Sequence, residues 1–319
     1  MRSEFLESEL ELYVQRLLVH EYYCTGNQYK MLKISPSEER LKGYDAKITG
    51  LTTFYCQFKT SDFIKQGGLY NSRCNFNKSN GWPDQPFYAF SLRVPNNPGD
   101  KADPAAWQHN ILHSLWNANS TSVTYVAPLF HTRLHLDLHE PFFAGCALHH
   151  KCFPQSKIAT RDVKVNNVIR CKLPFFDGLV SIPPHIAVNN LKHSYAFTSH
   201  QDITFHSDPE QVEGGKPFGN MLADFVRTSI ERDTIAGTQK MSVDIIKQML
   251  GDAGTNENFL IPFINYGLSQ AGINTSQITR NILESFENID FIRQHIVLSA
   301  SLHAYFGITM LGLLRFEEH

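Results

Sequence analysis

One stretch of the sequence, residues 43–59, constrains the fold more than any other. It contains two runs of strand-forming residues with a Thr-Gly pair at positions 49–50 between them, which predicts two consecutive strands joined by a tight turn. In the second run Gln57 and Lys59 share one face and the phenylalanines share the other, because side chains alternate along a strand. The predicted hairpin therefore has an apolar face and a polar face, and the polar face places an amide and an ammonium beside the carboxylate of Asp45.

These three side chains suit a divalent metal ion in phosphodiester chemistry. Asp45 offers a carboxylate oxygen and Gln57 an amide oxygen, and both are ligand types that Mg²⁺ accepts. Lys59 follows Gln57 on the same face at about 6.5–7 Å along the strand, close enough to orient a water molecule or offset phosphate charge. The alternative is a charged hairpin that only faces solvent.

Hydrophobic spacing outlines the remaining elements. Early in the chain it gives a helix, strands, a helix, a strand and a helix, an order that indicates a mixed α/β sheet flanked by helices. A polar, glycine-bearing loop is expected after Lys59. The predicted helices cover 3–20, 104–117, 133–143, 218–232, 242–250, 261–270 and 276–286, and the further predicted strands cover 28–34, 87–94, 122–130, 163–173, 178–182, 195–197 and 203–206.

The 319 residues are enough for one large domain or two smaller ones. Composition changes near residues 207–217, where helical spacing begins to dominate. We therefore expect a core over residues 1–145, a β-rich continuation of it over 146–210, and a mainly helical C-terminal region over 217–319.

Gly43-Tyr44-Asp45 at the head of one strand and Gln57-Phe58-Lys59 at the end of the next resemble the PD-(D/E)xK nuclease superfamily. The order of elements over residues 3–143 supports this resemblance. It implies a restriction-endonuclease-like fold and Mg²⁺- or Mn²⁺-dependent hydrolysis of nucleic acid, with DNA the expected substrate and host defence a plausible role. Asp45 and Gln57 would ligate the metal, and Lys59 would act on the attacking water and the phosphate.

The sequence departs from the commonest form of that motif at two positions. Tyr44 stands where proline is usual, and Gln57 replaces glutamate, as it does in members related to type IV, methylation-dependent restriction enzymes. The glutamine removes one negative charge, which should weaken metal binding and favour a one-metal mechanism.

Many members of the superfamily add a glutamate from the first helix, which could restore the lost charge. Glu7 and Glu11 are candidates here, as is Glu39 just before Gly43. Each of these glutamates also suits a capping or surface position.

Charge and the remaining motifs limit other functions. The net charge of −2 gives no global attraction to nucleic acid, so binding must rely on a local basic surface. The segment from Cys146 to Cys152 holds two cysteines and two histidines, but their spacing is not that of a zinc site, and zinc is not expected. Histidines recur every four residues from His131 to His139, which indicates a solvated helix face. The basic residues near the predicted site are Lys42, Lys47, Lys59, Lys65, Arg73, Lys78 and Arg93.

Several features indicate a cytoplasmic protein that does not enter a membrane. Six scattered cysteines and a charged first segment are typical of a chain with free thiols and no secretory leader. Residues 295–314 carry no formal charge and are long enough to span a bilayer, but their polar side chains favour a buried helix that breaks near Gly307 into a strand. A double-strand cutter usually needs two sites, so a homodimer is a reasonable expectation.

Two alternatives to a nuclease remain open from the sequence. The first is a non-catalytic descendant of the same fold that binds nucleic acid or a protein partner, with Gln57 marking a lost metal site. The second is an unrelated interaction protein whose hairpin is merely polar.

Overall fold

The chain forms a mixed α/β fold built around a six-stranded sheet, with a second, five-stranded sheet and a separate β-hairpin. The larger sheet has the order β1-β13-β2-β5-β8-β12, the smaller one β11-β10-β9-β4-β3, and β6 pairs with β7. The computed structural model describes residues 1–24, 28–34, 48–93, 104, 107–139, 160–207, 209–232, 257–273, 286 and 288–316.

The strands are β1 (Tyr29–Lys33), β2 (Ile48–Phe58), β3 (Asp62–Ile64), β4 (Phe87–Ser91), β5 (Val123–Pro128), β6 (Thr160–Val165), β7 (Val168–Pro174), β8 (Leu179–Ile182), β9 (Ser194–Phe197), β10 (Thr204–His206), β11 (Glu210–Gln211), β12 (Lys216–Pro217) and β13 (Thr309–Phe316). The helices are α1 (Glu7–Cys24), α2 (Gly68–Asn80), α4 (Gln108–Ala118), α5 (Arg133–His139), α7 (Phe218–Glu231), α10 (Glu257–Gln270) and α12 (Phe291–Phe306).

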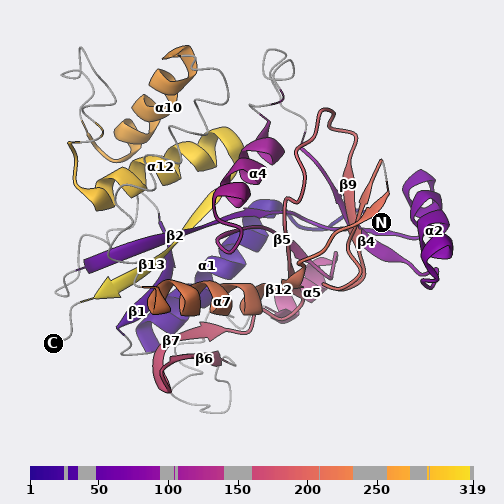
Figure 1. The fold of residues 1–319 in the computed structure, drawn as a ribbon, viewed down its shortest axis with the longest axis horizontal. Coiled ribbons are helices and arrows are strands. Elements are labelled where there is room, and N and C mark those ends of the chain that lie inside the picture. Colours follow the sequence, from indigo (N-terminus) through magenta and orange to yellow (C-terminus); the bar gives the residue numbers. More distant parts are fainter. Residues whose placement is uncertain are drawn as a thin grey trace.

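Helices cover both faces of the larger sheet (Figure 1). On one face α1, α7 and the β6–β7 hairpin pack against β2, where the ring of Phe54 lies 5.2 Å from that of Phe225. On the other face α4, α10 and α12 share a second core with the smaller sheet. Phe90 of β4 joins the two sheets, because its ring lies 5.3 Å from Tyr125 of β5 and 5.2 Å from Tyr195 of β9.

The predicted turn at positions 49–50 is wrong, because both residues lie inside the continuous strand β2. Gly50 pairs with Arg315, and the antiparallel ladder between β2 and β13 runs on to the pair of Cys56 with Thr309. A partner from the far end of the sequence thus hydrogen-bonds along β2, and the local Thr-Gly pair does not reverse the chain. Residues 35–47, which include Asp45 and Glu39, lie outside the described residues.

The predicted break of the last apolar segment at Gly307 is confirmed. Gly307 ends α12 in the left-handed region, with φ of 62°, and its N–H donates to the carbonyl of His303. The strand that follows, β13, lies between β1 and β2. The larger sheet therefore draws strands from both sides of the composition change near residues 207–217. Within the described residues, no helix combines the length and apolar character needed to cross a lipid bilayer.

Two expectations about loops and hairpins need correction. The segment after Lys59, predicted as a loop, contains the 13-residue helix α2, which ends at Gly81 with φ of 71°. The run 163–173, predicted as one strand, folds into the β6–β7 hairpin, since Asn166 and Asn167 both adopt positive φ. Consecutive positive φ values suit the tight turns of two-residue hairpins.

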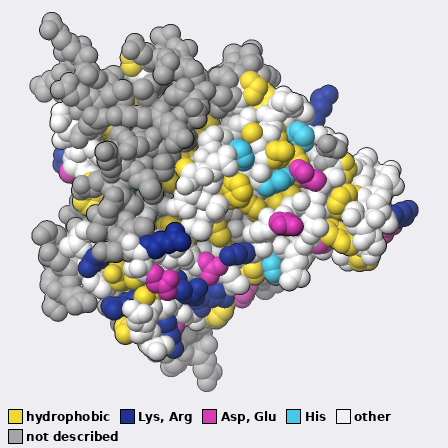
Figure 2. Space-filling model, in the orientation of Figure 1, with side chains coloured by type: hydrophobic (Ala, Val, Ile, Leu, Met, Phe, Trp, Pro, Cys, Tyr) yellow, Lys and Arg dark blue, Asp and Glu magenta, His cyan; other side chains and the backbone are white. Residues whose placement is uncertain are grey.

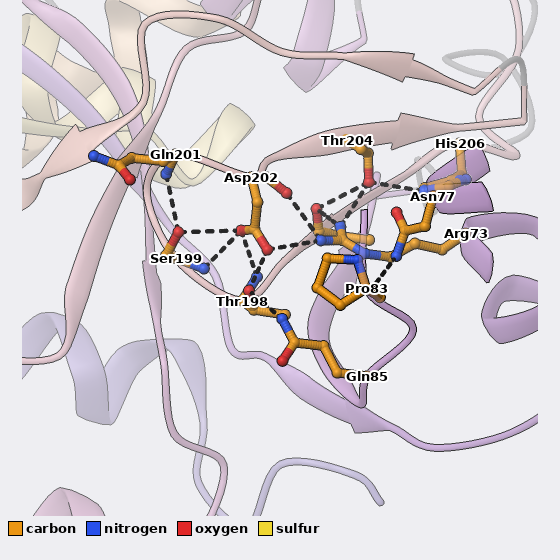
Figure 3. A network of polar contacts seen from close by, with 11 residues as sticks. Arg73, Asn77, Pro83, Gln85, Thr198, Ser199, Gln201, Asp202, Thr204 and His206 are labelled. Atoms are coloured by element: carbon orange, nitrogen blue, oxygen red, sulfur yellow. Dashed lines mark hydrogen bonds and ion pairs between the residues drawn. The ribbon is translucent and has the colours of Figure 1, made fainter. Parts of the chain in front are cut away.

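Arg73 explains why a helix of mostly polar residues forms at α2. Its side chain is 2% exposed, and the guanidinium donates to the carbonyl oxygen of Ala196, to Thr204 Oγ1 at 2.7 Å, and to both the carbonyl and the carboxylate of Asp202 (Figure 3). The same group stacks over Phe87 at 4.9 Å from the ring centroid. Arg73 thus attaches α2 to the smaller sheet. The prediction that it belongs to a basic surface near the site is wrong, because its side chain is buried.

Candidate functional site

The carboxyl ends of β2 and β5 meet at one edge of the larger sheet. These two strands form the one parallel pair among the described strands, in register from Tyr55 with Val123 to Phe58 with Val126. Ligands in α/β sheets commonly bind just beyond the carboxyl ends of parallel strands. Gln57 and Lys59 lie at this edge, and the backbone N–H of Lys59 still donates to the carbonyl of Val126 at 2.9 Å.

Gln57 is a buried side chain whose hydrogen-bonding groups are unsatisfied among the described residues. Its side chain is 1% exposed, and neither its amide nitrogen nor its amide oxygen has a partner among the described residues. Buried polar groups in folded proteins are almost always hydrogen-bonded, so this amide has unused donor and acceptor capacity. Its neighbour across the ladder is Tyr125, whose hydroxyl lies 2.7 Å from Nδ1 of His109.

Lys59 is also buried, and its charge is balanced by the first helix. The side chain is 3% exposed, and its Nζ lies 3.4 Å from Oε1 of Glu7. Burial lowers the pKa of Lys59, while the carboxylate of Glu7 opposes that shift and the nearby charge of Arg93 adds to it. The ammonium therefore sits in a poorly solvated position, where its interaction with an anion is stronger than it would be in water.

The first helix places Glu7 and Glu11 differently. Glu7 is the glutamate that reaches Lys59. The carboxylate of Glu11 accepts hydrogen bonds from Lys33 Nζ at 2.7 Å and Thr309 Oγ1 at 2.8 Å, which ties α1 to β1 and β13. Glu11 thus contacts Lys33, Thr309 and, at 4.0 Å, Nδ1 of His303, and no described contact joins it to Lys59.

The sequence did not single out Ser61, and it assigned His131 to a solvated helix face. Ser61 is fully buried and His131 is 8% exposed, and the hydroxyl of Ser61 and both ring nitrogens of His131 lack partners among the described residues. His131 precedes α5, and its ring stacks on Phe63 at 5.1 Å. The sequence signal for this position is its place three residues after the end of β5, a wholly buried strand.

The described residues fit only part of a metal site. They contain no group of three or more histidine, cysteine, aspartate or glutamate side chains that could hold an ion. The oxygen of Gln57, which has no hydrogen-bond partner among the described residues, suits one Mg²⁺ ligand position, while the carboxylate of Glu7 is paired with Lys59. Asp45 and the segment from Cys146 to Cys152, for which zinc is not expected, lie outside the described residues.

The basic surface expected from the sequence is smaller in the structure. Lys59 and Arg73 are buried and paired with carboxylates, and Lys42 and Lys47 lie outside the described residues. Another group of charges covers α7 and the β6–β7 hairpin, where Lys and Arg side chains alternate with Asp and Glu (Figure 2). There Asp224 pairs with both Lys216 and Arg227, so this face is mixed in sign.

Comparisons of the chain with protein-family models, with curated proteins and with solved structures found no match.

Proposed function

We propose that this protein is a metal-dependent nuclease with a restriction-endonuclease-like core, whose active site lies at the carboxyl ends of β2 and β5. One observation carries the proposal. Gln57 and Lys59, the pair that resembles the superfamily motif, lie at the end of a central strand as buried polar side chains, and the Gln57 amide has no partner among the described residues. Stability alone does not favour such an arrangement, because burying an unpaired amide costs about 1–3 kcal/mol.

The chemistry assigns a role to each side chain. A bound Mg²⁺ ion would polarise the phosphoryl oxygen and lower the pKa of an attacking water molecule. The oxygen of Gln57 would hold that ion together with the carboxylate of Asp45. The ammonium of Lys59 would stabilise negative charge that develops on the phosphate, and its burial makes that interaction strong. Glu7 would keep Lys59 charged and oriented until the substrate binds.

Substitution of the site residues tests this assignment. We expect Lys59→Met to reduce Mg²⁺-dependent cleavage of DNA at least about 100-fold, the usual cost of losing one charge-stabilising group. Asp45→Asn should abolish cleavage if Asp45 ligates the metal, and Gln57→Glu should lower the Mg²⁺ concentration needed for half-maximal activity. Lys164→Met, which removes an exposed lysine on β6, is the control. Cleavage that is unaffected by Lys59→Met would refute the proposed site.

A second candidate function is binding of nucleic acid without catalysis. The absence of an acidic cluster among the described residues favours it, as does glutamine in place of a carboxylate at position 57. Binding of DNA or RNA with no cleavage across a titration of Mg²⁺ and Mn²⁺ would support this function over the nuclease. The host-defence role and the homodimer rest on the resemblance alone, and sedimentation with and without duplex DNA tests the dimer.

A further inference from the structure

The burial of Gln57 and Lys59 raises a problem of access. A nucleic-acid backbone cannot contact side chains that are 1% and 3% exposed unless a part of the protein that covers them moves. The segment made of residues 1–9, which we call the acidic strap, lies across this edge of the sheets.

Backbone contacts hold the strap in place. The N–H of Phe63 donates to the carbonyl of Met1 at 2.8 Å, and the N–H of Ser3 donates to Oδ1 of Asp62 at 3.0 Å. Further along, the N–H of Glu4 donates to the carbonyl of His131 at 2.8 Å. The strap thus runs from β3 to the residues that follow β5.

Three carboxylates of the strap form ion pairs or accept a backbone hydrogen bond at this edge. Glu7 contacts Lys59 at 3.4 Å, Glu9 contacts Nη2 of Arg133 at 2.6 Å, and Oε2 of Glu4 accepts the backbone N–H of Arg133 at 2.9 Å. Each contact marks a place where the protein already stabilises an anion. The side chains of Glu7 and Glu9 are 47% and 36% exposed, so water can replace them at low cost.

Two polar side chains with no hydrogen-bond partner among the described residues, Ser61 and His131, belong to the segments that the strap contacts. Ser61 follows Lys59 by two residues and directly precedes Asp62, which contacts the strap. His131 provides the carbonyl that accepts from Glu4. The hydroxyl of Ser61 and the ring of His131 have no partner among the described residues, and both can donate hydrogen bonds to phosphate oxygens.

We propose that Lys59, Ser61, His131 and Arg133 form a phosphate-binding track for a nucleic-acid backbone, and that the carboxylates of the acidic strap occupy this track in the present structure. Nucleic acid therefore binds by displacing the strap. This inference rests on the proposed function, since it takes nucleic acid as the ligand of the same site.

Equilibrium binding of a fluorescein-labelled 20-mer DNA duplex to the full chain tests the track in Ca²⁺, which permits binding to be measured apart from cleavage. We expect Glu4→Gln/Glu7→Gln/Glu9→Gln to bind about tenfold more tightly than the natural chain. The matched control is Asp162→Asn/Asp224→Asn/Glu231→Gln, which changes net charge equally on the face around α7. Arg133→Ala should weaken binding and reduce the slope of log K against log salt concentration by about 1, as loss of one phosphate contact predicts.

The reactivity of Lys59 toward an amine-acylating reagent, read by mass spectrometry, gives a second measurement. Lys59 should be protected in the natural chain, labelled in the triple strap variant, and protected again when duplex is added. Equal tightening by the strap variant and by its control, or binding that is unchanged by Arg133→Ala, would overturn the track. If the track variants behave as expected and no substrate is cleaved, the nuclease proposal fails while the track stands.

Discussion

Arg73→Ala is the perturbation whose effect the structure defines most fully. The substitution removes a guanidinium that donates to four acceptors: the carbonyls of Ala196 and Asp202, Thr204 Oγ1 and the Asp202 carboxylate. It also removes the stacking on Phe87. These contacts attach α2 to the smaller sheet, so the loss acts on the docking of a whole helix.

The expected loss in free energy of unfolding depends on the contacts that Asp202 keeps after the substitution. Removing one partner of a buried charge pair costs about 3–5 kcal/mol. Asp202 keeps the backbone N–H groups of Thr198 and Ser199 at 2.8 and 2.7 Å, and its side chain is 23% exposed, so water compensates part of the loss. We therefore expect the lower part of that range, about 3–4 kcal/mol. Because proteins are stable by only about 5–15 kcal/mol, this is a large fraction of the total.

Urea unfolding followed by circular dichroism measures this change. Arg73→Lys should cost about 2 kcal/mol, since an ammonium keeps the charge but cannot reproduce the planar fork of donors. Lys78→Ala, an exposed position on the same helix, is the control and should change stability by less than about 0.5 kcal/mol. A loss below about 1 kcal/mol for Arg73→Ala, or a loss equal to that of the control, would refute the reasoning.

Two further predictions concern acid stability and the end of α12. Burial lowers the pKa of His109 to about 4, so this neutral histidine contributes stability that is complete above its unfolded pKa near 6.5 and is lost as pH falls toward 4. Through this group the free energy of unfolding should drop by about 2 kcal/mol between pH 7.5 and 5. In urea titrations, the unfolding free energy of His109→Gln should vary less with pH by that amount. A variant whose unfolding free energy varies with pH as much as that of the natural chain would contradict the assignment. Gly307→Ala should cost about 1–2 kcal/mol in thermal unfolding, because φ of 62° strains a residue with a Cβ. Gly272→Ala, at φ of 70° with open space around its Cβ, shows whether the strain alone accounts for the cost.

The sequence predicted elements whose signal is local and missed those fixed by distant partners. The strands β1, β4 and β5 follow from their own apolar residues, and the break at Gly307 follows from one glycine. The uninterrupted course of β2 cannot be predicted from local residues, because Cys56 of β2 pairs with Thr309, 253 residues away in the sequence. Helix α2 was missed because its stability depends on one buried arginine and not on an apolar stripe.

The sequence predicts the residues of the candidate site but not how they pack. Gln57 and Lys59 were identified from their spacing, and the structure places both at the end of a central strand. Their burial, the pairing of Lys59 with Glu7, and the position of His131 depend on how the first nine residues pack across two sheets. Residue spacing along one strand carries no information about such packing.

The position of β13 has a consequence for how this protein is made. In the described sheets β1 pairs with β13 alone, and β2 pairs with β13 from Ile48 to Cys56. During synthesis on the ribosome, these two early strands therefore leave the exit tunnel long before the strand that separates them exists. Unpaired strand edges of this kind are prone to aggregation. We expect the nascent chain to depend on chaperones until β13 is synthesised, and ribosome-bound chains that stop before residue 309 to be degraded by proteases that the full chain resists.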